Sequence, residues 1–166
     1  MAVDEEVIRR AQRGDAAALD VVVRELAPYV GRICGAIALG DGDDAIQEAM
    51  VAIVRNLRSV REPAALRGWA RRIAVREAVR VARGGRYSPV DPATIATVVS
   101  VPDGATATEV RAVLASLTPE QRAVLVLRHV DGLHEDEMAD VLGIASGTVK
   151  SRLHRARAAF REQWSA

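Results

Sequence analysis

The stretch from residue 132 to residue 157 constrains the fold more than any other part of the chain. It reads GLHEDEMADVLGIASGTVKSRLHRAR, and counting from Glu135 it places Ala139 fifth and Gly143 ninth. A small alanine lets two helices cross closely, and a glycine in the turn adopts a left-handed conformation at little cost. Apolar residues recur at spacings that bury one stripe on each of two short helices: Met138, Leu142, Ile144, Val149 and Leu153. The pattern predicts a helix-turn-helix.

The two predicted helices differ in charge. The first carries four acids and no base, whereas the second is basic from Lys150 to Arg161 with no acid before Glu162. A basic helix behind an acidic one suits a recognition helix that enters a groove lined by phosphates. The alternative is a solvated helix pair in an ordinary bundle. We expect the exposed side of the second helix to face DNA, through Ser146, Thr148, Lys150, Ser151, Arg152 and Arg155, while Val149 and Leu153 are buried.

Residues 117–162, LTPEQRAVLVLRHVDGLHEDEMADVLGIASGTVKSRLHRARAAFRE, resemble the promoter −35-binding region 4 of bacterial sigma factors. They look most like the small extracytoplasmic-function group. Output domains of response regulators share a similar helix-turn-helix, so the N-terminal half has to distinguish the two classes. The family usually has Ser where Ala145 stands. Ser146 can take over as the cap one residue later, with a slightly shifted helix start; an uncapped start would cost about 1 kcal/mol.

Residues 4–83 are predicted to be helical almost throughout. Apolar residues recur every three or four positions, first from Leu19 to Ile37 and then from Ile46 to Leu57. Asp15 after Gly14 can cap a helix, and Pro63 interrupts the chain before a helix that ends at residues 84–85. No segment alternates with a period of two. We therefore expect an all-α fold made of two small helical domains joined by a flexible linker.

This half resembles sigma region 2. Arg13-Gly14-Asp15 matches the family's opening, and residues 43–48, DDAIQE, match the acidic helix that in the family docks on the clamp helices of the polymerase β′ subunit. The residues expected at that contact are Asp43, Asp44, Gln47 and Glu48. Burial of Ile46, Met50 and Ile53 would leave those side chains free for a basic partner surface. A solvated helix start, with acids at the positive end of the dipole, is the alternative.

Residues 66–74, LRGWARRIA, match the family's helix that opens and reads the −10 element. The resemblance assigns −10 contacts to Trp69, Arg72, Arg76 and Arg80. The arginines fall four apart and share one helix face, which can follow a phosphate backbone or stack on exposed bases. The alternatives are a solvated face for the arginines and a core anchor for Trp69. The family commonly has Asn at position 76 and Asp at position 80, so base preference at −10 is left open.

The expected domain boundaries are 1–83 for region 2, 84–108 for the linker and 109–166 for region 4. The linker contains Pro89, Pro92 and Pro102 among Gly, Ser and Thr and lacks sustained periodicity. Fully extended, it could reach about 80 Å, which is ample for two domains on separate DNA elements. Thr118 and Gln121 offer a capping box for the first helix of region 4, with Pro119 at its first position.

Several classes of protein are disfavoured by composition. Cys34 is the single cysteine, so there is no disulfide framework, and its apolar neighbours predict a buried thiol, with a redox sensor as the alternative. The three histidines form no zinc pattern, and we expect no metal and no cofactor. No signal peptide opens the chain and no apolar run approaches a membrane span, so a cytoplasmic protein without membrane insertion is expected.

Taken together, the residues and the resemblance predict a sigma factor with only regions 2 and 4, and not an enzyme. It would bind core RNA polymerase, at the β′ clamp helices and the β flap, and direct it to promoter DNA. An anti-sigma factor is a further partner that the resemblance allows. Two alternatives remain: a helix-turn-helix regulator that does not join polymerase, and an all-helical adaptor that binds no DNA.

Overall fold

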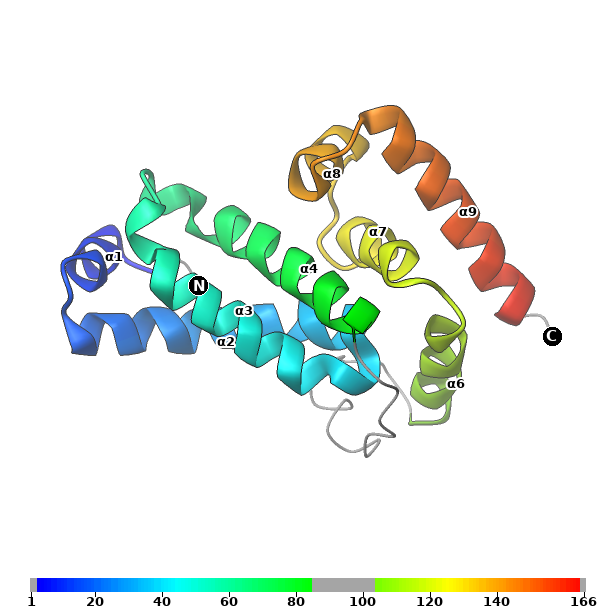
Figure 1. Cartoon of the computed structure of the whole chain (residues 1–166), viewed down its shortest axis with the longest axis horizontal. Coiled ribbons are helices and arrows are strands. Elements are labelled where there is room, and N and C mark those ends of the chain that lie inside the picture. The colour runs from blue at the N-terminus through cyan, green and yellow to red at the C-terminus, as the bar shows by residue number, and fades with distance from the viewer. Residues whose placement is uncertain (1–2, 85–103, 165–166) are drawn as a thin grey trace.

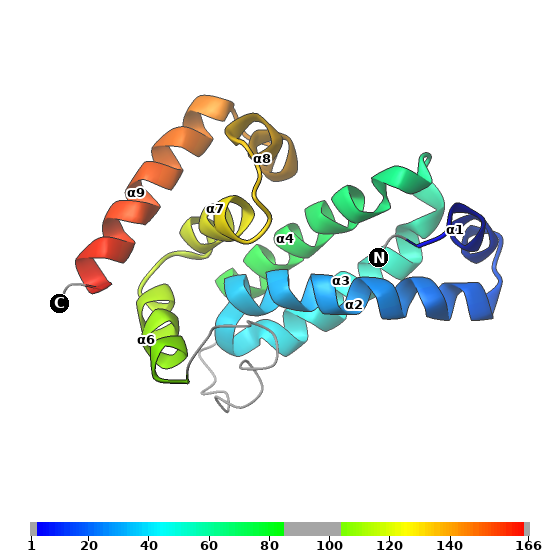
Figure 2. The same ribbon diagram turned by 180° about the vertical axis from the view of Figure 1, so that it is seen from behind.

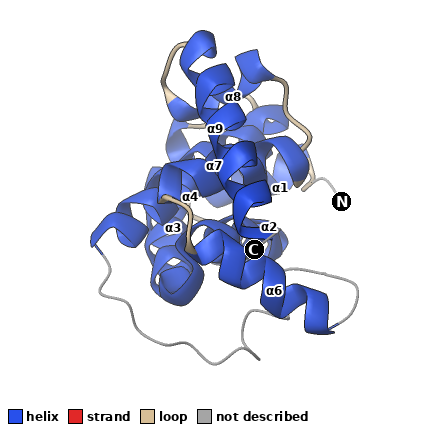
Figure 3. Cartoon of the chain, turned by 90° about the vertical axis from the view of Figure 1, so that its right-hand side faces the viewer, coloured by secondary structure: helices blue, strands red, loops and turns tan. Residues whose placement is uncertain are grey.

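The structure, a computed structural model, describes residues 3–84 and 104–164, and within these ranges the regular elements are all helical (Figure 3). The expected all-α fold is confirmed. The α-helices are α1 (Glu5–Gln12), α2 (Ala16–Ala38), α3 (Gly42–Asn56), α4 (Leu66–Gly84), α6 (Gly104–Ala115), α7 (Pro119–His129), α8 (Glu135–Leu142) and α9 (Ser146–Trp164). Three short 3₁₀ turns, Leu39–Asp41, Leu57–Ser59 and Pro63–Ala65, connect the helices of the first half.

Helix α2 is the longest element, and α1, α3 and α4 pack around it (Figures 1 and 2). It begins as the sequence predicts, because the Asp15 carboxylate accepts a hydrogen bond of 3.0 Å from the Ala18 N–H. From Tyr29 to Ala38 every residue except Arg32 is buried. A helix that is apolar on nearly all sides has to be covered on nearly all sides, so this half of α2 forms the centre of the core.

Helix α3 packs more closely than the sequence suggests. The predicted stripe of Ile46, Met50 and Ile53 is only partly right, since Ile46 and Met50 are half-buried. Ala45 and Ala49 are fully buried instead, because small side chains let α3 approach α2. At the start of α3, a Cβ added to Gly42 would lie 3.2 Å from the Gly35 Cα. Glycine at both positions permits this crossing.

The second half of the chain packs directly on the first. The predicted capping box at α7 is confirmed: Thr118 Oγ1 accepts from the Gln121 N–H, and the Gln121 side chain accepts from the Thr118 N–H. Helix α7 contacts α2 and α4 on one side and α9 on the other, which both ribbon views show (Figures 1 and 2). Buried residues of both halves form one continuous apolar cluster. Helix α6 begins at Gly104, ahead of residue 109, and the linker prolines lie outside the described residues.

Cys34 is an inert core thiol. It is fully buried, its Sγ lies 3.7 Å from the Ala74 carbonyl oxygen, and burial raises its pKa to about 12. The thiolate is the reactive form of cysteine, so it is scarce at physiological pH.

We therefore predict that Cys34 resists thiol reagents in the native protein. At pH 8 an aromatic disulfide reagent should label it only after addition of denaturant, because the pKa lies far above the working pH. The measurement is the absorbance of the released thiol with and without denaturant. Rapid stoichiometric labelling of the native protein would reinstate the redox-sensor alternative.

Candidate nucleic-acid interface

The helix-turn-helix forms from the residues that predicted it. Gly143 has φ +64°, and its N–H donates to the Ala139 carbonyl, so the turn takes the left-handed conformation expected of glycine. The start of α8 is fixed by Glu137, whose carboxylate accepts a 2.7 Å hydrogen bond from the His134 N–H. Met138 and Val149 are completely buried, one from each helix. The two apolar stripes therefore meet.

The start of α9 differs from expectation. The helix begins at Ser146, so Ala145 occupies the N-cap position, and its carbonyl accepts from the N–H groups of Thr148 and Val149. The prediction that Ser146 takes over the cap is wrong. Its hydroxyl instead donates to Asp136 Oδ1 of α8 at 2.7 Å. The serine thus ties the two helices together, and alanine offers the first turn no side-chain acceptor.

The rest of the predicted recognition face is solvent-accessible. Thr148, Lys150, Ser151 and Arg155 are exposed, while Ser146 and Arg152 are half-buried. Burial of Val149 and Leu153 is confirmed, at 0% and 3% exposure. One side of α9 is thereby fixed in the core, and the opposite side presents hydroxyl and cationic groups to solvent.

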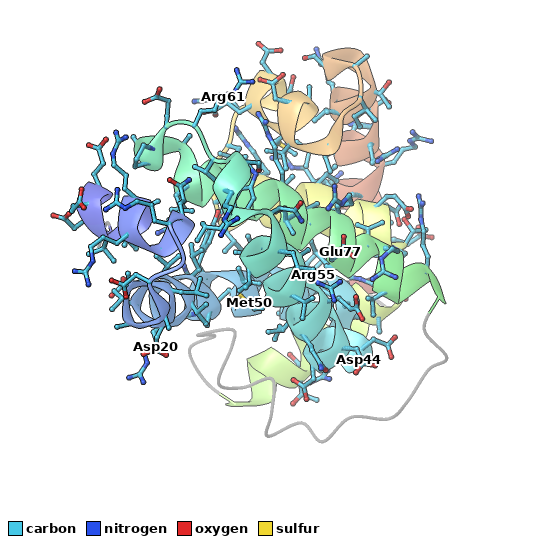
Figure 4. All side chains as sticks on the ribbon, turned by 60° about the vertical axis from the view of Figure 1, so that its left-hand side comes forward. Asp20, Asp44, Met50, Arg55, Arg61 and Glu77 are labelled. Atoms are coloured by element: carbon cyan, nitrogen blue, oxygen red, sulfur yellow. The ribbon has the colours of Figure 1, made fainter. Side chains whose placement is uncertain are left out.

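A second exposed face runs along α3. Asp43, Asp44, Gln47 and Glu48 are all exposed at its N-terminal half, and Figure 4 shows Asp44 at the outer end of the helix. The structure extends this face with two valines that the sequence analysis passed over. Val51 and Val54 are each 39% exposed although they are apolar. Val51 lies four residues after Gln47 and three after Glu48, and Val54 lies three after Val51, so helical spacing is the signal that could have placed both valines on the same face.

The arginine stripe of α4 is exposed but partly paired. Arg76 Nε donates to Glu77 Oε1 at 3.2 Å, and Arg80 Nε donates to Glu77 Oε2 at 2.7 Å. Glu77 is buried at 9% exposure, and Figure 4 places it on α4. Glu77 is the one acid among residues 67–83, and no sequence pattern assigned it a role. Arg80 also reaches Glu48 Oε2 of α3 at 3.2 Å, which links the α4 stripe to the α3 face.

Arg72 and Trp69 differ in their surroundings. Arg72 is exposed and has no charged partner within the described residues, so it is the stripe member available to an outside anion. Trp69 is half-buried and packs against the core cluster. That position fits the core-anchor alternative for Trp69 and leaves only part of the indole open to solvent.

Two other kinds of site are absent from the described residues. Across residues 3–84 and 104–164, no group of three or more His, Cys, Asp or Glu side chains is arranged to hold a metal ion. Among the helices of the same ranges, none combines the length and the apolarity that a membrane crossing requires.

Comparison with known proteins matches both halves. The family profile for Sigma-70 region 2 covers residues 22–86, and that for Sigma-70 region 4 covers residues 107–160. The chain is 34% identical to the ECF RNA polymerase sigma factor SigM of Mycobacterium tuberculosis, over 93% of this chain and 81% of the relative. It belongs to the ECF sigma factors of RNA polymerase. It is also 32% identical to the ECF RNA polymerase sigma-E factor of Escherichia coli, over 95% of this chain and 92% of the relative.

Solved structures show the same fold for this sigma factor. It superposes on CnrH, determined in complex with the cytosolic domain of CnrY, with a TM-score of 0.67 and 24% identity over 96% of both chains. The sigma factor RpoE of Bartonella quintana, determined with the anti-sigma factor NepR, gives the same TM-score at 18% identity, covering 89% of this chain and 97% of that one. The family profiles and the sequence relatives do not favour the alternative of a helix-turn-helix regulator that does not join polymerase.

The uncapped start of α9 generates a stability prediction. Ala145→Ser places a hydroxyl at the N-cap, where it can accept from a first-turn N–H, so the free energy of unfolding should rise by about 1 kcal/mol. For a domain of this size the melting temperature should rise by about 2–4 °C. Calorimetry measures the shift, with Ala158→Ser on the exposed middle of α9 as the matched control. Equal shifts in both variants would contradict the capping explanation.

Proposed function

We propose that this ECF sigma factor reads the −35 element through the exposed face of α9. The observation that carries the proposal is the division of that helix, with Val149 and Leu153 in the core and Thr148, Lys150, Ser151 and Arg155 in solvent. Donors and a cation on one rigid helix face suit base edges and phosphates in the major groove. The Asp136–Ser146 hydrogen bond holds the angle between α8 and α9.

Core polymerase is proposed to dock on the α3 face. The acids at its N-terminal half suit a basic partner, here the β′ clamp helices, and charge complementarity favours encounter and register. Val51 and Val54 add exposed apolar area that a docked partner would remove from water. An acidic end next to an apolar centre favours a docking surface over a merely solvated helix start.

The α4 stripe is proposed to bind the −10 strand, with Arg72 as its principal free cation. Arg76 and Arg80 share Glu77, which holds their guanidinium groups side by side on one face. Both guanidinium groups are themselves exposed although Glu77 is buried, so each arginine can reach phosphate oxygens while it stays beside Glu77. Region 4 is proposed to use the β flap as its second site on polymerase, and an anti-sigma factor remains a candidate regulator.

The chain itself is proposed to carry no catalytic step, since RNA synthesis belongs to polymerase, and to work in the cytoplasm where polymerase and chromosome meet. The experiment that tests the function is transcription with purified core polymerase and this protein, followed by mapping of start sites. Starts that depend on the protein support the proposal. Failure to copurify with core polymerase would favour the regulator alternative.

For the −35 contacts, Arg155→Ala should weaken binding of holoenzyme to promoter DNA. The loss is about 1–3 kcal/mol if the guanidinium reads a guanine edge. If Arg155 touches only phosphate, the loss is uniform across sequences and the salt slope becomes shallower. Footprint titrations at two salt concentrations measure both, with the exposed Arg161→Ala variant two turns further along α9 as control. Unchanged footprints for Arg155→Ala and Lys150→Ala would remove α9 from the contact.

For the polymerase contact, Asp44→Lys should weaken binding of core polymerase while leaving the fold intact. Asp44 is exposed, lies off the buried stripe, and has no ion-pair partner in the described part of the chain, so the loss reflects the partner surface. Glu48→Lys should act in the same direction. A pull-down with circular dichroism as folding control measures this, and Asp20→Lys, an exposed acid of α2, is the matched control. Full affinity in both α3 variants would place the docking surface elsewhere.

For promoter opening, Arg72→Gln should reduce the fraction of open complexes because a cation is lost beside the melted strand. Permanganate reactivity of unpaired thymines measures opening, and a −35 footprint checks initial binding. Arg24→Gln provides a control, since that exposed arginine of α2 lies away from the α4 stripe and pairs with Asp20 of its own helix. If opening and −35 occupancy fall together while core binding persists, the stripe captures duplex DNA and does not bind the melted strand.

A further inference from the structure

The exposed face of α3 continues past its two valines and ends in two arginines. Arg55, in the last turn of α3, lies four residues after Val51, and Arg58, in the Leu57–Ser59 turn, lies four residues after Val54. Side chains three or four positions apart share one side of a helix. Both arginines are exposed, and Figure 4 shows Arg55 further along the α3 ribbon from Asp44. The face is therefore acidic, apolar and basic in turn.

The basic end of the face, Arg55 and Arg58, is held in place from α1. Arg58 Nε donates to the Gln12 carbonyl oxygen at 3.0 Å. The Gln12 side chain donates in turn to the carbonyl oxygens of Leu57 and Val60, at 3.0 and 2.7 Å, and both of these residues are buried. Donation from Nε uses one of the five guanidinium N–H groups and leaves the Nη groups of Arg58 for a partner.

The two arginines differ in pairing from other exposed arginines of the first half. Neither Arg55 nor Arg58 forms an ion pair within residues 3–84 and 104–164. Their positive charge is therefore not met by a carboxylate of the described part of the chain. The exposed arginines of α1 and of the following turns do pair with nearby carboxylates, namely Arg9, Arg10, Arg13 and Arg24.

The charge order alone has a local explanation, because acids at the start and bases at the end of a helix complement its dipole. That explanation leaves the centre of the face unexplained, since Val51 and Val54 are each 39% exposed between the charged ends. It also does not extend to Arg58, which lies beyond Asn56, the last residue of α3. A partner that covers the valines accounts for the apolar centre and both charged ends together.

The two ends act as separate electrostatic sites. Asp44 and Arg58 are 14 positions apart, which corresponds to about 20 Å along a helix. This separation exceeds the screening length of about 8 Å at physiological ionic strength. A partner that carried only basic side chains would be attracted at one end and repelled at the other. The matching partner has basic side chains opposite Asp44 and acidic side chains opposite Arg58.

We propose that Arg55 and Arg58 form the second charged end of the polymerase docking face and pair with acidic side chains of the β′ clamp helices. The inference rests on the proposed docking of core polymerase on the α3 face. Two ends of opposite charge fix the direction in which the clamp helices lie along α3. The reversed alignment would bring like charges together at both ends, so it is excluded by repulsion.

Charge reversal at the basic end distinguishes this arrangement from general attraction between an acidic sigma face and a basic clamp. Arg55→Glu and Arg58→Glu should each weaken binding of core polymerase to the full-length chain by about fivefold or more, because lost attraction and new repulsion act in the same direction. General attraction predicts the opposite, since each variant adds an acid to the acidic face. Surface plasmon resonance on immobilised core polymerase measures the affinity.

Arg61→Glu is the matched control. Arg61 is exposed, has no ion pair within the described residues, and lies apart from Arg55 in Figure 4. Its variant makes the same change of charge and should leave the affinity for core polymerase unchanged. Arg55→Glu keeps the test informative if Arg58→Glu loosens the turn, because Arg55 takes no part in the Gln12 contacts. Equal weakening by Arg61→Glu, or unchanged or stronger binding by Arg55→Glu and Arg58→Glu, would overturn the proposal.

An exchange of the two ends tests direction at constant net charge. Asp44→Arg combined with Arg58→Asp inverts the charge order and keeps the formal net charge at +1. This double variant should bind core polymerase more weakly than Asp44→Arg alone, with circular dichroism as the folding control. Equal affinity of the two would remove Arg58 from the contact. Full affinity of Asp44→Lys would instead overturn the docking of polymerase on α3 altogether, whereas its weakening without any loss in Arg55→Glu and Arg58→Glu overturns the basic end alone.

Discussion

The burial of the C-terminal half of α2 is the constraint on which the rest of the molecule depends. From Tyr29 to Ala38 this helix exposes only Arg32, so its apolar surface has to be covered from several directions at once. Helices α3 and α4 cover it within region 2, and α7 covers it from region 4. Because one helix supplies core to both regions, the position of region 4 is set by the same burial that folds region 2.

Arginine has two separate uses in this chain. Arg122 directs its donors to the carbonyl oxygens of Ile37, Leu114 and Leu117, so a buried cation is satisfied without a carboxylate contact. A planar guanidinium can serve several fixed acceptors in this way, which a lysine ammonium does less well. Arg72 and Arg155 instead extend into solvent. No buried side-chain nitrogen or oxygen in the described residues lacks a hydrogen-bond partner, so the polar groups buried between the two regions are satisfied.

Local features were predictable from the sequence because they depend on neighbours in the chain. The Gly143 turn, the Asp15 cap and the Thr118 capping box each require residues within a few positions of one another, and all three form. The burial of Val149 and Leu153 followed from helical period in the same way. The stripe on α3 was predicted less well, since the choice between Ile46 and Ala45 depends on how closely α2 approaches.

No local feature of the sequence predicted the long-range contacts. Tyr29 and Asp131 are separated by 102 positions, and Arg122 reaches Ile37 across 85. Spacing and charge runs carry no information on such pairs, so Asp131 resembled an ordinary turn residue and Arg71 one more member of an arginine run. The burial of Glu77 had no local signal either, because it depends on how α4 packs and periodicity alone does not fix that packing. The roles of the exposed residues toward DNA and polymerase stay predictions.

Asp131, in the turn between α7 and α8, accepts hydrogen bonds from Tyr29 of α2 and Arg71 of α4, and this contact also bears on how regions of such proteins can be exchanged. A chimera that joins this region 2 to region 4 of a relative keeps each binding face but replaces the turn that carries Asp131. Arg71 and Tyr29 then face whatever residue the relative's region 4 supplies. A relative without an acid at that position leaves a buried cation without its counter-charge. Region swaps therefore change the contact between the two regions together with the recognition helix, and the residue before Gly132 belongs to the design as much as that helix does.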